Sequence, residues 1–574
     1  MNSRKQNSNF RIYFLIFIFL IIGLVITSRL FLIQVRDRDY YKALASKQHI
    51  KTGILEAKRG KIFFSDEINV LAENKGTATI NIAPREVQDA KELAKILAPI
   101  VKMGEKEILE KIFSENDPWI ILKKNVSIEK TGKLRGINGV YLEPNFTRHY
   151  SQKKMCSHVL GFFGYSKNGE KRVGQYGIEG YWNKELQGKE GYWEGVVDAS
   201  GNKILSPFNK IKESIDGDYL VSTIDSNIQF FAEKELESLF KKYSPENGTI
   251  IVADPKTGEI LAMASKPNFD PNNYQKEKDI NIFKNPAVSV SFEPGSIFKP
   301  IVMAGALEDG VLSPKTTYID KGASVIGNYV IKNSDLKSHG KKTMTEVLEL
   351  SLNTGMVFVS QKLGSKNLIK YVQKFGFGEE TAIDLYGEAL GNINNILNPL
   401  SNEKKIEYAN ASFGQGISAT PVQMVSAFST IANQGEPIMP HIIKKQIHPD
   451  ESEKEIKGEK RKRVISAETA SKLTAMLVSV VKNGYGSKAG VDGYLIAGKT
   501  GTAQVPNLEE GGYFKNKHIH SFIGYAPAFN PEFLIFLKID NPKGIRFSSD
   551  SLAPSFSNIA KYLFSYFGIP PEEK

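Results

Sequence analysis

The chain has 574 residues, of which 41% are hydrophobic, 24% charged and 10% aromatic. This composition excludes a mostly disordered, collagen-like or polytopic membrane chain, and the length predicts several structural units. The 75 Lys and Arg residues outnumber the 63 Asp and Glu residues and give a net charge of +12, which indicates anionic surroundings of an unspecified kind. The single cysteine, Cys156, excludes an intramolecular disulfide.

The first strong pattern is an unbroken apolar run at residues 12–26, which continues with mostly apolar residues to position 33. A helix needs roughly 17–25 residues to cross a bilayer, and the extended run reaches this length if the long side chain of Arg29 reaches the interface. Basic residues precede the run without an acidic one. The positive-inside rule therefore predicts a cytoplasmic tail at 1–10, a transmembrane anchor at 11–35 and the remaining chain outside the cytoplasm.

A cleaved signal peptide is the alternative interpretation of this region. Ala43 and Ala45 form an A-x-A triplet, but the charged stretch 36–39 separates it from the apolar run. Because a cleavage site follows its apolar region closely, a retained anchor is favoured.

The external part is predicted to contain two domains. Residues 36–215 alternate short β-like runs with charged helical stretches, contain no recognisable reaction centre, and are expected to form a pedestal. Turn formers and charges at 206–218 predict a linker. Residues 216–567 are expected to form the catalytic domain, followed by a tail at 568–574.

The second domain is predicted to be an antiparallel sheet covered by helices, which gives an α+β fold class for the chain. Two apolar runs flank a Pro- and Gly-containing turn and predict a β-hairpin at 249–264. Further strands are expected at 493–499, 521–525 and 533–539, and helices at 226–242 and 466–481. The charged segment 451–463 is expected to be a solvated loop rather than a basic binding patch.

Ser296 and Lys299 form an S-x-x-K motif whose context distinguishes it from other copies, among them those at Ser127, Ser151, Ser200, Ser334 and Ser401. Pro300 is tolerated only in the first turn of the helix that follows, so Ser296 is predicted to lie at a helix N-terminus. Residues i and i+3 share a helix face, which lets the Lys299 amine reach the Ser296 hydroxyl, and a serine needs such a base to become a nucleophile. The simpler alternative is an N-cap serine with an exposed lysine.

Two further motifs follow Ser296 and Lys299 along the chain, and the order of the three motifs is informative. Ser351 and Asn353 form S-x-N after a helix that a capping box opens at Thr343, and Lys499-Thr500-Gly501 follows a strand-like run. Serine acyl-transfer enzymes of the penicillin-recognising type carry S-x-x-K, S-x-N and K-T-G in this order. Each motif is weak alone, and together they are a strong signal.

Two other kinds of site are weaker candidates. Residues 493–500 satisfy the phosphate-loop pattern G-x-x-x-x-G-K-T, but the following residues cannot readily begin the helix that such a loop requires. His518 and His520 have no flanking carboxylate or thiol to complete a metal site, so no metal is expected. Cys156 is expected to be a small apolar filler.

By these motifs the chain resembles the class B penicillin-binding proteins, the monofunctional DD-transpeptidases of bacterial cell-wall synthesis. The resemblance extends to pedestal segments and covers the chain from the anchor to about residue 567. The ending of the catalytic domain is most similar to the division-specific, septal branch. The segments that carry the resemblance are 59–62, 148–150, 177–179, 248–272, 292–296, 414–416, 420–421, 497–504 and 520–527.

The resemblance implies a role for each motif residue. Ser296 would attack the penultimate D-Ala of a stem peptide, with Lys299 as proton acceptor. Ser351 would relay a proton to the leaving amine, and Asn353 would bind the substrate amide. Lys499, with Thr500, Gly501 and Thr502, would hold the substrate carboxylate, and the amides of Ser296 and Thr502 would form the oxyanion hole.

The resemblance also implies partners and leaves alternatives open. Expected partners are peptidoglycan stem peptides, β-lactams, a polytopic glycan polymerase and small division membrane proteins at a bacterial cytoplasmic membrane; no cofactor and no nucleic acid are expected. The alternatives are an elongation-type transpeptidase, a carboxypeptidase or β-lactamase-like hydrolase with the same site, and a catalytically inert division scaffold.

Overall fold

The computed structural model describes residues 3–42, 50–114, 117–166, 168–169, 171–196, 210–399, 405–507 and 512–572. The chain forms two compact units, residues 1–58 with 188–216 and residues 59–187 with 217–574. The A-x-A triplet at residues 43–45 lies outside the described residues.

The first unit contains the apolar N-terminal helix. Helix α1 (Ser3–Phe31) continues into the π-helical turn η1 (Leu32–Arg36), and an 18-residue window within the segment Phe10–Arg36 has a mean hydropathy of 2.7. Its length and composition suffice to cross a membrane. The same unit holds a small antiparallel sheet of β1 (Ile50–Leu55), β8 (Gly191–Val196) and β9 (Lys210–Lys212). Strand β9 lies inside the predicted linker, where no regular structure was expected.

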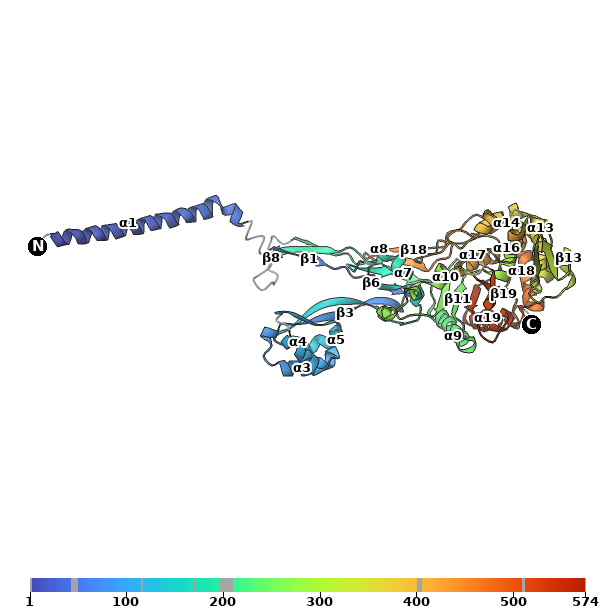
Figure 1. Cartoon of the computed structure of the whole chain (residues 1–574), viewed down its shortest axis with the longest axis horizontal. Helices are drawn as coiled ribbons and strands as arrows, with labels where there is room; N and C mark the ends of the chain where they lie inside the picture. Colours follow the sequence, from blue (N-terminus) through green and yellow to red (C-terminus); the bar gives the residue numbers. More distant parts are fainter. Residues whose placement is uncertain are drawn as a thin grey trace. The chain divides into compact units, whose positions relative to one another are not determined.

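The second unit begins with a pedestal built on a seven-stranded sheet of order β18-β17-β10-β2-β3-β4, with β5 paired to β3. Helices α3 and α4 lie beside the sheet (Figure 1). Their Leu93, Leu97 and Ile108 belong to one buried cluster with Ile80 and Ile82 of β3. The pedestal elements are β2 (Ile62–Phe63), β3 (Val70–Ile82), η2 (Pro84–Glu86), α3 (Ala90–Val101), α4 (Glu105–Ser114), β4 (Ile120–Ser127), α5 (Ile128–Thr131), η3 (Gly132–Leu134), β5 (Val140–Tyr150), α6 (Ser157–Leu160), β6 (Phe162–Tyr165), β7 (Arg172–Gln175), α7 (Gly177–Tyr181) and α8 (Asn183–Leu186).

Three strands of this pedestal sheet come from the later part of the chain. They are β10 (Tyr219–Ser222), β17 (Ile443–Ile447) and β18 (Glu453–Glu455). Strand β10 pairs in parallel with β2 and antiparallel with β17. The segment 451–463 is exposed as expected, but the prediction of a loop was wrong at β18, because these residues pair with β17.

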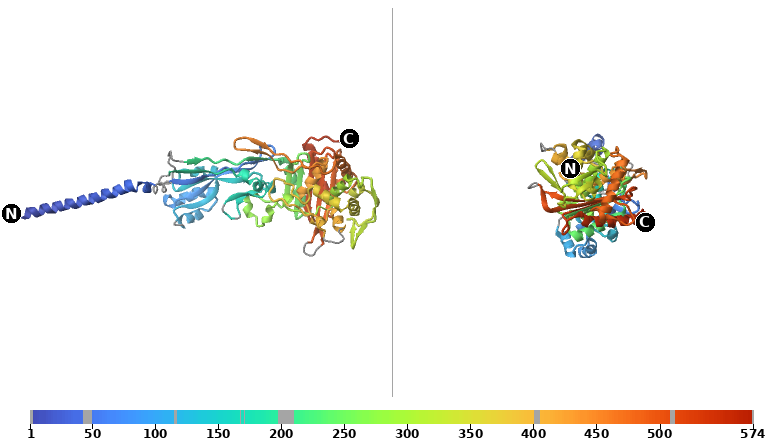
Figure 2. Two further views of the ribbon diagram at one scale, coloured as in Figure 1. Left: turned by 90° about the horizontal axis from the view of Figure 1, so that it is seen from above. Right: turned by 90° about the vertical axis from the view of Figure 1, so that its right-hand side faces the viewer.

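The catalytic domain is organised around a five-stranded antiparallel sheet of order β12-β11-β21-β20-β19, which confirms the predicted fold class. Its strands are β11 (Asn247–Ala253), β12 (Ile260–Lys266), β19 (Ala497–Pro506), β20 (Tyr513–Ala526) and β21 (Phe533–Asp540). Figure 2 shows the late strands, orange to red, forming one layer with helices against it. The predicted hairpin at 249–264 is β11 and β12. The predicted strand at 493–499 begins only at Ala497 and runs on to Pro506.

The two faces of this sheet bury alternate residues, as the period of two in a strand requires. Ile250 and Val252 face α9 (Ser226–Tyr243) and α19 (Ser548–Tyr566), whereas Ile251 belongs to the core on the other side. That second side is covered by α11 (Lys299–Glu308), α17 (Pro421–Ala432) and α18 (Ala467–Asn483).

A helical region beside the sheet carries two small hairpins. Strand β13 (Thr317–Asp320) pairs with β16 (Gly340–Thr343), and β14 (Ala323–Ile326) pairs with β15 (Tyr329–Lys332). The remaining elements are η4 (Pro271–Lys276), η5 (Ile280–Phe283), α10 (Pro286–Ser289), η6 (Gly295–Phe298), α12 (Met344–Glu349), α13 (Asn353–Leu363), α14 (Ser365–Lys374), α15 (Asn394–Leu397), α16 (Lys405–Ala411) and η7 (Ser487–Ala489).

Candidate active site

The three motifs converge where α11, the α12–α13 connection and β19 meet. Ser296 lies in the 3-10 turn η6, directly before α11, and Pro300 occupies the first turn of that helix as predicted. Ser296 is therefore not an N-cap, because the cap position of α11 is Phe298. The simple alternative of a capping serine with an exposed lysine was wrong, since Lys299 is fully buried.

The S-x-N motif lies on the turn between two helices. The predicted capping box is present, with the Thr343 side chain and Glu346 bonded reciprocally at the start of α12. Ser351 follows the end of α12 with a left-handed φ of 53°, and Asn353 begins α13. This tight connection directs both side chains toward Lys299.

The Lys299 amine lies at the centre of the hydrogen-bond network. Its Nζ lies 2.5 Å from the Ser351 carbonyl oxygen, 2.9 Å from Asn353 Oδ1 and 3.2 Å from Ser351 Oγ. No hydrogen bond between described residues joins Lys299 Nζ to Ser296 Oγ, so the expected direct contact is not formed. Burial, and then the charge of Lys499, lower the pKa of Lys299 well below its ordinary value.

The lowered pKa favours a neutral Lys299, and this geometry can accommodate one. A neutral amine has two N–H groups, which the carbonyl oxygens of Ser351 and Asn353 accept, and one lone pair. The third neighbour, the Ser351 hydroxyl, accepts from a protonated Lys299, and it is the one group of the three that could instead donate to the lone pair of a neutral amine. The amine is thus held ready to accept a proton.

Lys499 approaches the same serine from the sheet. Its Nζ donates to Ser351 Oγ at 3.0 Å and to the Thr500 carbonyl oxygen at 3.1 Å, and burial lowers its pKa to about 7. The K-T-G residues, which were predicted at the end of a strand, lie inside β19 because the strand continues beyond them. Because β19 continues as a strand to Pro506, no helix follows Thr500, and the phosphate-loop interpretation fails.

Glycines let the strand and the serine turn come close together. A Cβ on Gly501 would lie 2.3 Å from Ser521 Oγ, 3.0 Å from Ile297 and 3.3 Å from the Pro294 carbonyl oxygen. Gly295 has φ +57°, and a Cβ there would lie 3.0 Å from that of Ala503. Both positions therefore require a residue without a side chain.

The Thr502 side chain is held by hydrogen bonds to a residue outside the three sequence motifs. Thr502 Oγ1 accepts from the Ser548 backbone N–H at 3.1 Å and donates to Ser548 Oγ at 3.3 Å, at the first residue of α19. His520, opposite Thr502 in β20, is buried, and burial lowers its pKa to about 4. Its two ring nitrogens lie 2.8 Å from Ser551 Oγ and 3.1 Å from the Arg546 carbonyl oxygen. His520 therefore supports the strand and is not free for a metal.

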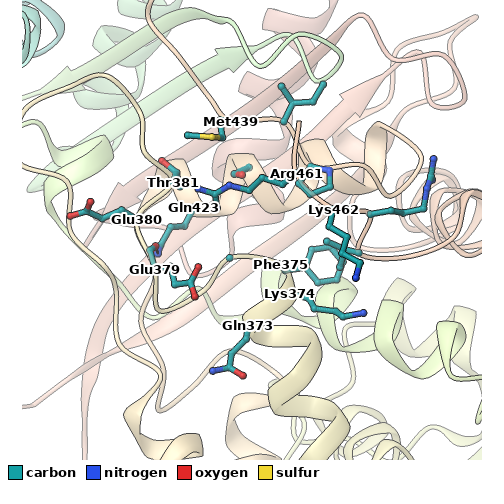
Figure 3. Close-up of a pocket in the computed structure, with 16 residues that line it drawn as sticks. Gln373, Lys374, Phe375, Glu379, Glu380, Thr381, Gln423, Met439, Arg461 and Lys462 are labelled. Carbon is teal, nitrogen blue, oxygen red and sulfur yellow. Dashed lines mark hydrogen bonds between the residues drawn. The ribbon is translucent and has the colours of Figure 1, made fainter. Parts of the chain in front are cut away.

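A separate cavity of about 250 Å³ lies elsewhere in the catalytic domain and contains none of the motif residues (Figure 3). It is bounded by the end of α14, α17 and the loops near residues 437–439 and 461–464. Figure 3 shows Lys374, Arg461 and Lys462 on one side and Glu379 and Glu380 on the other. Cys156, in the pedestal, is buried with a raised thiol pKa, as expected for a filler.

The sheet, its two helical layers and the motif order define a serine enzyme of the penicillin-recognising class. The family model for the penicillin-binding protein transpeptidase domain matches residues 248–561, and that for the penicillin-binding protein dimerisation domain matches residues 54–222. The chain belongs to the class B penicillin-binding proteins. In this family context, the N-terminal apolar helix anchors the chain in a membrane.

Similar proteins cover nearly the full chain. "Stage V sporulation protein D" of Bacillus subtilis is 35% identical over 98% of this chain and 86% of its own. "Peptidoglycan D,D-transpeptidase FtsI" of Buchnera aphidicola is 29% identical over 99% of this chain and 97% of its own. The crystal structure of penicillin-binding protein 2X from Streptococcus thermophilus has a TM-score of 0.77 at 26% identity and covers 90% of this chain and 80% of its own.

Proposed function

We propose that the protein is a peptidoglycan DD-transpeptidase that cross-links stem peptides through an acyl-enzyme on Ser296. The observation that carries this proposal is the buried Lys299 amine, held by Ser351 and Asn353 one helical turn from Ser296, with its pKa lowered. The family match, and relatives named as D,D-transpeptidases, support the same reaction.

In the first half-reaction, Ser296 Oγ attacks the carbonyl carbon of the penultimate D-Ala and its proton passes to the neutral Lys299 amine. The amides of Ser296 and Thr502 stabilise the oxyanion, a contribution typically worth about 3–4 kcal/mol per lost donor. Collapse of the tetrahedral intermediate breaks the peptide bond. The proton returns through the Ser351 hydroxyl to the leaving amine, which departs as D-Ala.

In the second half-reaction, the amine of another stem peptide attacks the Ser296 ester. The amine loses a proton to the Lys299–Ser351 pair, the ester bond breaks, and Ser296 Oγ recovers a proton. Lys499, Thr500 and Thr502 bind the donor's carboxylate before acylation, and Asn353 binds its amide. A β-lactam uses the same groups and leaves Ser296 acylated.

Covalent labelling tests the nucleophile and the reaction class. A fluorescent penicillin should label the wild type and leave Ser296→Ala unlabelled, with Lys299→Ala strongly impaired because the proton acceptor is lost. Equal labelling of Ser296→Ala would refute the assignment. Rapid release of penicilloate by the wild type would favour a hydrolase, and failure of the wild type to label would favour an inert scaffold.

We infer a topology with the N-terminus in the cytoplasm and the catalytic domain outside, because Arg4, Lys5 and Arg11 precede the membrane segment. Expected partners there are a glycan-polymerising membrane protein and small division proteins that contact the anchor and pedestal. Protease added to intact protoplasts should remove the catalytic domain, and protection of that domain would contradict this topology.

For the cellular role we favour septal wall synthesis, since two relatives are named FtsI or FtsI homolog. The sporulation protein of Bacillus subtilis favours a second candidate, a role in sporulation. Depletion distinguishes these roles: filaments support septal work, round cells support elongation, and normal growth with defective spores supports sporulation.

A further inference from the structure

Glu293 lies three residues before Ser296 and makes contacts that the proposed reaction does not use. Its Oε1 accepts a hydrogen bond from the Gly416 backbone N–H at 3.0 Å and another from the Tyr513 hydroxyl at 3.3 Å. Its Oε2 is buried and has no hydrogen-bond partner among the described residues. A buried carboxyl with an unsatisfied oxygen is costly, so its retention beside the nucleophile calls for a physical explanation.

The carboxyl connects three segments that are distant in the sequence. Glu293 belongs to the serine turn, defined here as residues 293–296. Gly416 belongs to the loop 414–416, whose Gly414 carbonyl oxygen accepts from the Gly295 N–H at 3.0 Å. Tyr513 begins β20 and pairs with Pro506 at the outer end of the β19–β20 hairpin, whose inner end carries Lys499 and Thr502.

The inner end of the hairpin meets the serine turn by close packing. The Cβ positions at Gly295 and Gly501 are filled by Ala503, Ile297 and neighbouring backbone. Among the described residues of the turn and the hairpin, the Tyr513 hydroxyl supplies the only hydrogen bond between them. A packed contact fixes a minimum separation of two segments, whereas a hydrogen bond at the far end also resists their opening.

We propose that Glu293 is a positioning residue that uses Tyr513 and Gly416 to hold the β19–β20 hairpin against the serine turn, so that Ser296 and Thr502 keep the spacing that acylation requires. This inference rests on the proposed function. The oxyanion donors come from these two segments, and displacement of such groups by about 1 Å can lower a rate about 100-fold. Glu293 does not touch the substrate, and its effect passes through the hairpin.

The protonation of Glu293 modulates this contact. Burial raises the pKa of its carboxyl, while the Gly416 N–H and Tyr513 hydroxyl act in the opposite direction. Tyr513 is the titratable group that faces it from the hairpin; the loop 414–416 offers a backbone N–H, and the serine turn itself brings no other charged side chain. A carboxylate accepts more strongly than a carboxylic acid, so the contact weakens as pH falls through the raised pKa.

A double-mutant cycle on the full chain tests the coupling. The second-order rate of acylation by a fluorescent penicillin is measured for Tyr513→Phe, Glu293→Ala and the double variant. Tyr513→Phe should lower the rate roughly 5- to 20-fold in the wild type and leave it unchanged in the Glu293→Ala background. Equal effects of Tyr513→Phe in both backgrounds, or none in the wild type, would overturn the proposal.

Controls separate positioning from loss of fold and from loss of the proposed function. Tyr494→Phe removes another hydroxyl hydrogen bond of this domain, to Ile569, and should leave the rate unchanged. Glu293→Gln should rescue most of the Glu293→Ala loss, because its amide oxygen still accepts from Gly416 and Tyr513. If the wild type is acylated and Tyr513→Phe is acylated equally fast, only the positioning role is refuted. If the wild type is never acylated, the proposed function is refuted.

The pH profile supplies a readout that a purely structural role would not move. The ratio of the wild-type rate to the Glu293→Gln rate should fall toward one as the pH is lowered from 8 to the ordinary glutamate value of 4.5, because the wild-type carboxyl, whose pKa is raised, gains its proton over this range. Other titrating groups, Lys299 and Lys499 among them, cancel in this ratio. A ratio that stays constant across this range would contradict the proposal.

Discussion

The amines of Lys299 and Lys499 both lie within hydrogen-bonding distance of the Ser351 hydroxyl, and burial lowers the pKa of each amine. The pKa of Lys299 is lowered further by the neighbouring Lys499, because two ammonium groups beside Ser351 repel each other. A lowered pKa suits Lys299 to the proton-acceptor role in the proposed reaction, whereas the pKa of Lys499 lies at about 7. The two lysines can therefore carry the different tasks that the proposed reaction requires.

The pKa of Lys499, about 7, predicts how substrate binding depends on pH. Below pH 7 Lys499 is charged and attracts the donor carboxylate. As pH rises above 7 the amine loses its proton, and the affinity for the carboxylate should fall about tenfold per pH unit. The fall ends at the pKa of Lys499 in the complex, which the bound carboxylate raises. Calorimetry of penicillin binding to Ser296→Ala, which cannot be acylated, measures this. Lys499→Met should bind weakly with little pH dependence, and an unchanged wild-type-like slope in that variant would contradict the assignment.

Gly501 offers a test of the packing between strand and serine turn. In Gly501→Ala the new methyl would lie 2.3 Å from Ser521 Oγ on β20, which must rotate away, and 3.0 Å from Ile297 and 3.3 Å from the Pro294 carbonyl oxygen, which push β19 away from the turn. Overpacking of this kind costs about 1–3 kcal/mol, and the acylation rate should fall at least about tenfold. Gly104→Ala, where a Cβ meets nothing within 4 Å, should leave the acylation rate unchanged. A wild-type rate in Gly501→Ala would show that the close approach is dispensable.

The sequence predicted which residues gather at the site better than how they bond. Motif order identified Ser296, Lys299, Ser351, Asn353 and Lys499, and the structure brings them together, while their individual roles stay predictions. Helical spacing suggested a bond from Lys299 to Ser296, but the left-handed turn at Ser351 places its carbonyl and hydroxyl nearer the amine. Such long-range contacts depend on how loops fold over one another, which local spacing does not encode.

At the scale of elements, apolar runs were predicted well and polar strands were missed. The hairpin of β11 and β12 is strongly apolar and was predicted, whereas β9 and β18, with sequences Lys-Ile-Lys and Glu-Lys-Glu, are exposed along their length. These short strands exist because a neighbouring strand supplies hydrogen-bond partners. Their own side chains carry no β pattern, so composition indicated a linker and a loop.

A buried ion cluster joins the elements of the pedestal. Glu179 on α7 is fully buried; its two carboxylate oxygens accept from Arg59 Nε at 2.6 Å and from Arg148 Nε at 2.7 Å. Arg148 lies on β5, and its Nη1 also donates to the Gly60 carbonyl oxygen, next to β2. One carboxylate thus connects α7, β5 and the chain entering β2.

Removing this carboxylate should destabilise the pedestal strongly. Glu179→Ala leaves two buried guanidinium groups without their counter-ion, a change that costs about 3–5 kcal/mol, whereas Glu143→Ala on the exposed face of β5 should cost little. The two arginines hold the pKa of Glu179 below its ordinary 4.5, even though burial acts the other way. The stability it contributes is therefore present above about pH 4.5 and lost as pH falls below it. Denaturant titration of both variants at pH 7 and pH 4 measures this, and equal losses at Glu179 and Glu143 would contradict it.

At the scale of the whole molecule, the proposed division at residue 215 into pedestal and catalytic domain cuts across one sheet. Strand β10 lies just after this point, yet it pairs with β2 on one side and β17 on the other. Asp384 of the catalytic domain accepts from the Trp182 indole N–H of the pedestal at 3.2 Å, and from the backbone N–H groups of Ile442 and Ile443 next to β17. Within the second unit, the pedestal sheet and the catalytic domain therefore support each other.

This shared sheet predicts that the catalytic domain will not be fully stable by itself. A fragment of residues 217–572 keeps β10, β17 and β18 but loses β2 and β3, so β10 becomes an unpaired edge and Leu220 and Ile224 lose neighbours in the core. A fragment of residues 59–572 keeps every strand of the sheet. The shorter fragment should unfold several degrees lower and aggregate more readily, while its motif residues still meet and still react with penicillin when freshly folded. Equal unfolding temperatures for the two fragments would mean that strand pairing across residue 215 does not stabilise the catalytic domain. Loss of acylation in the shorter, folded fragment would mean that the pedestal also positions the active site.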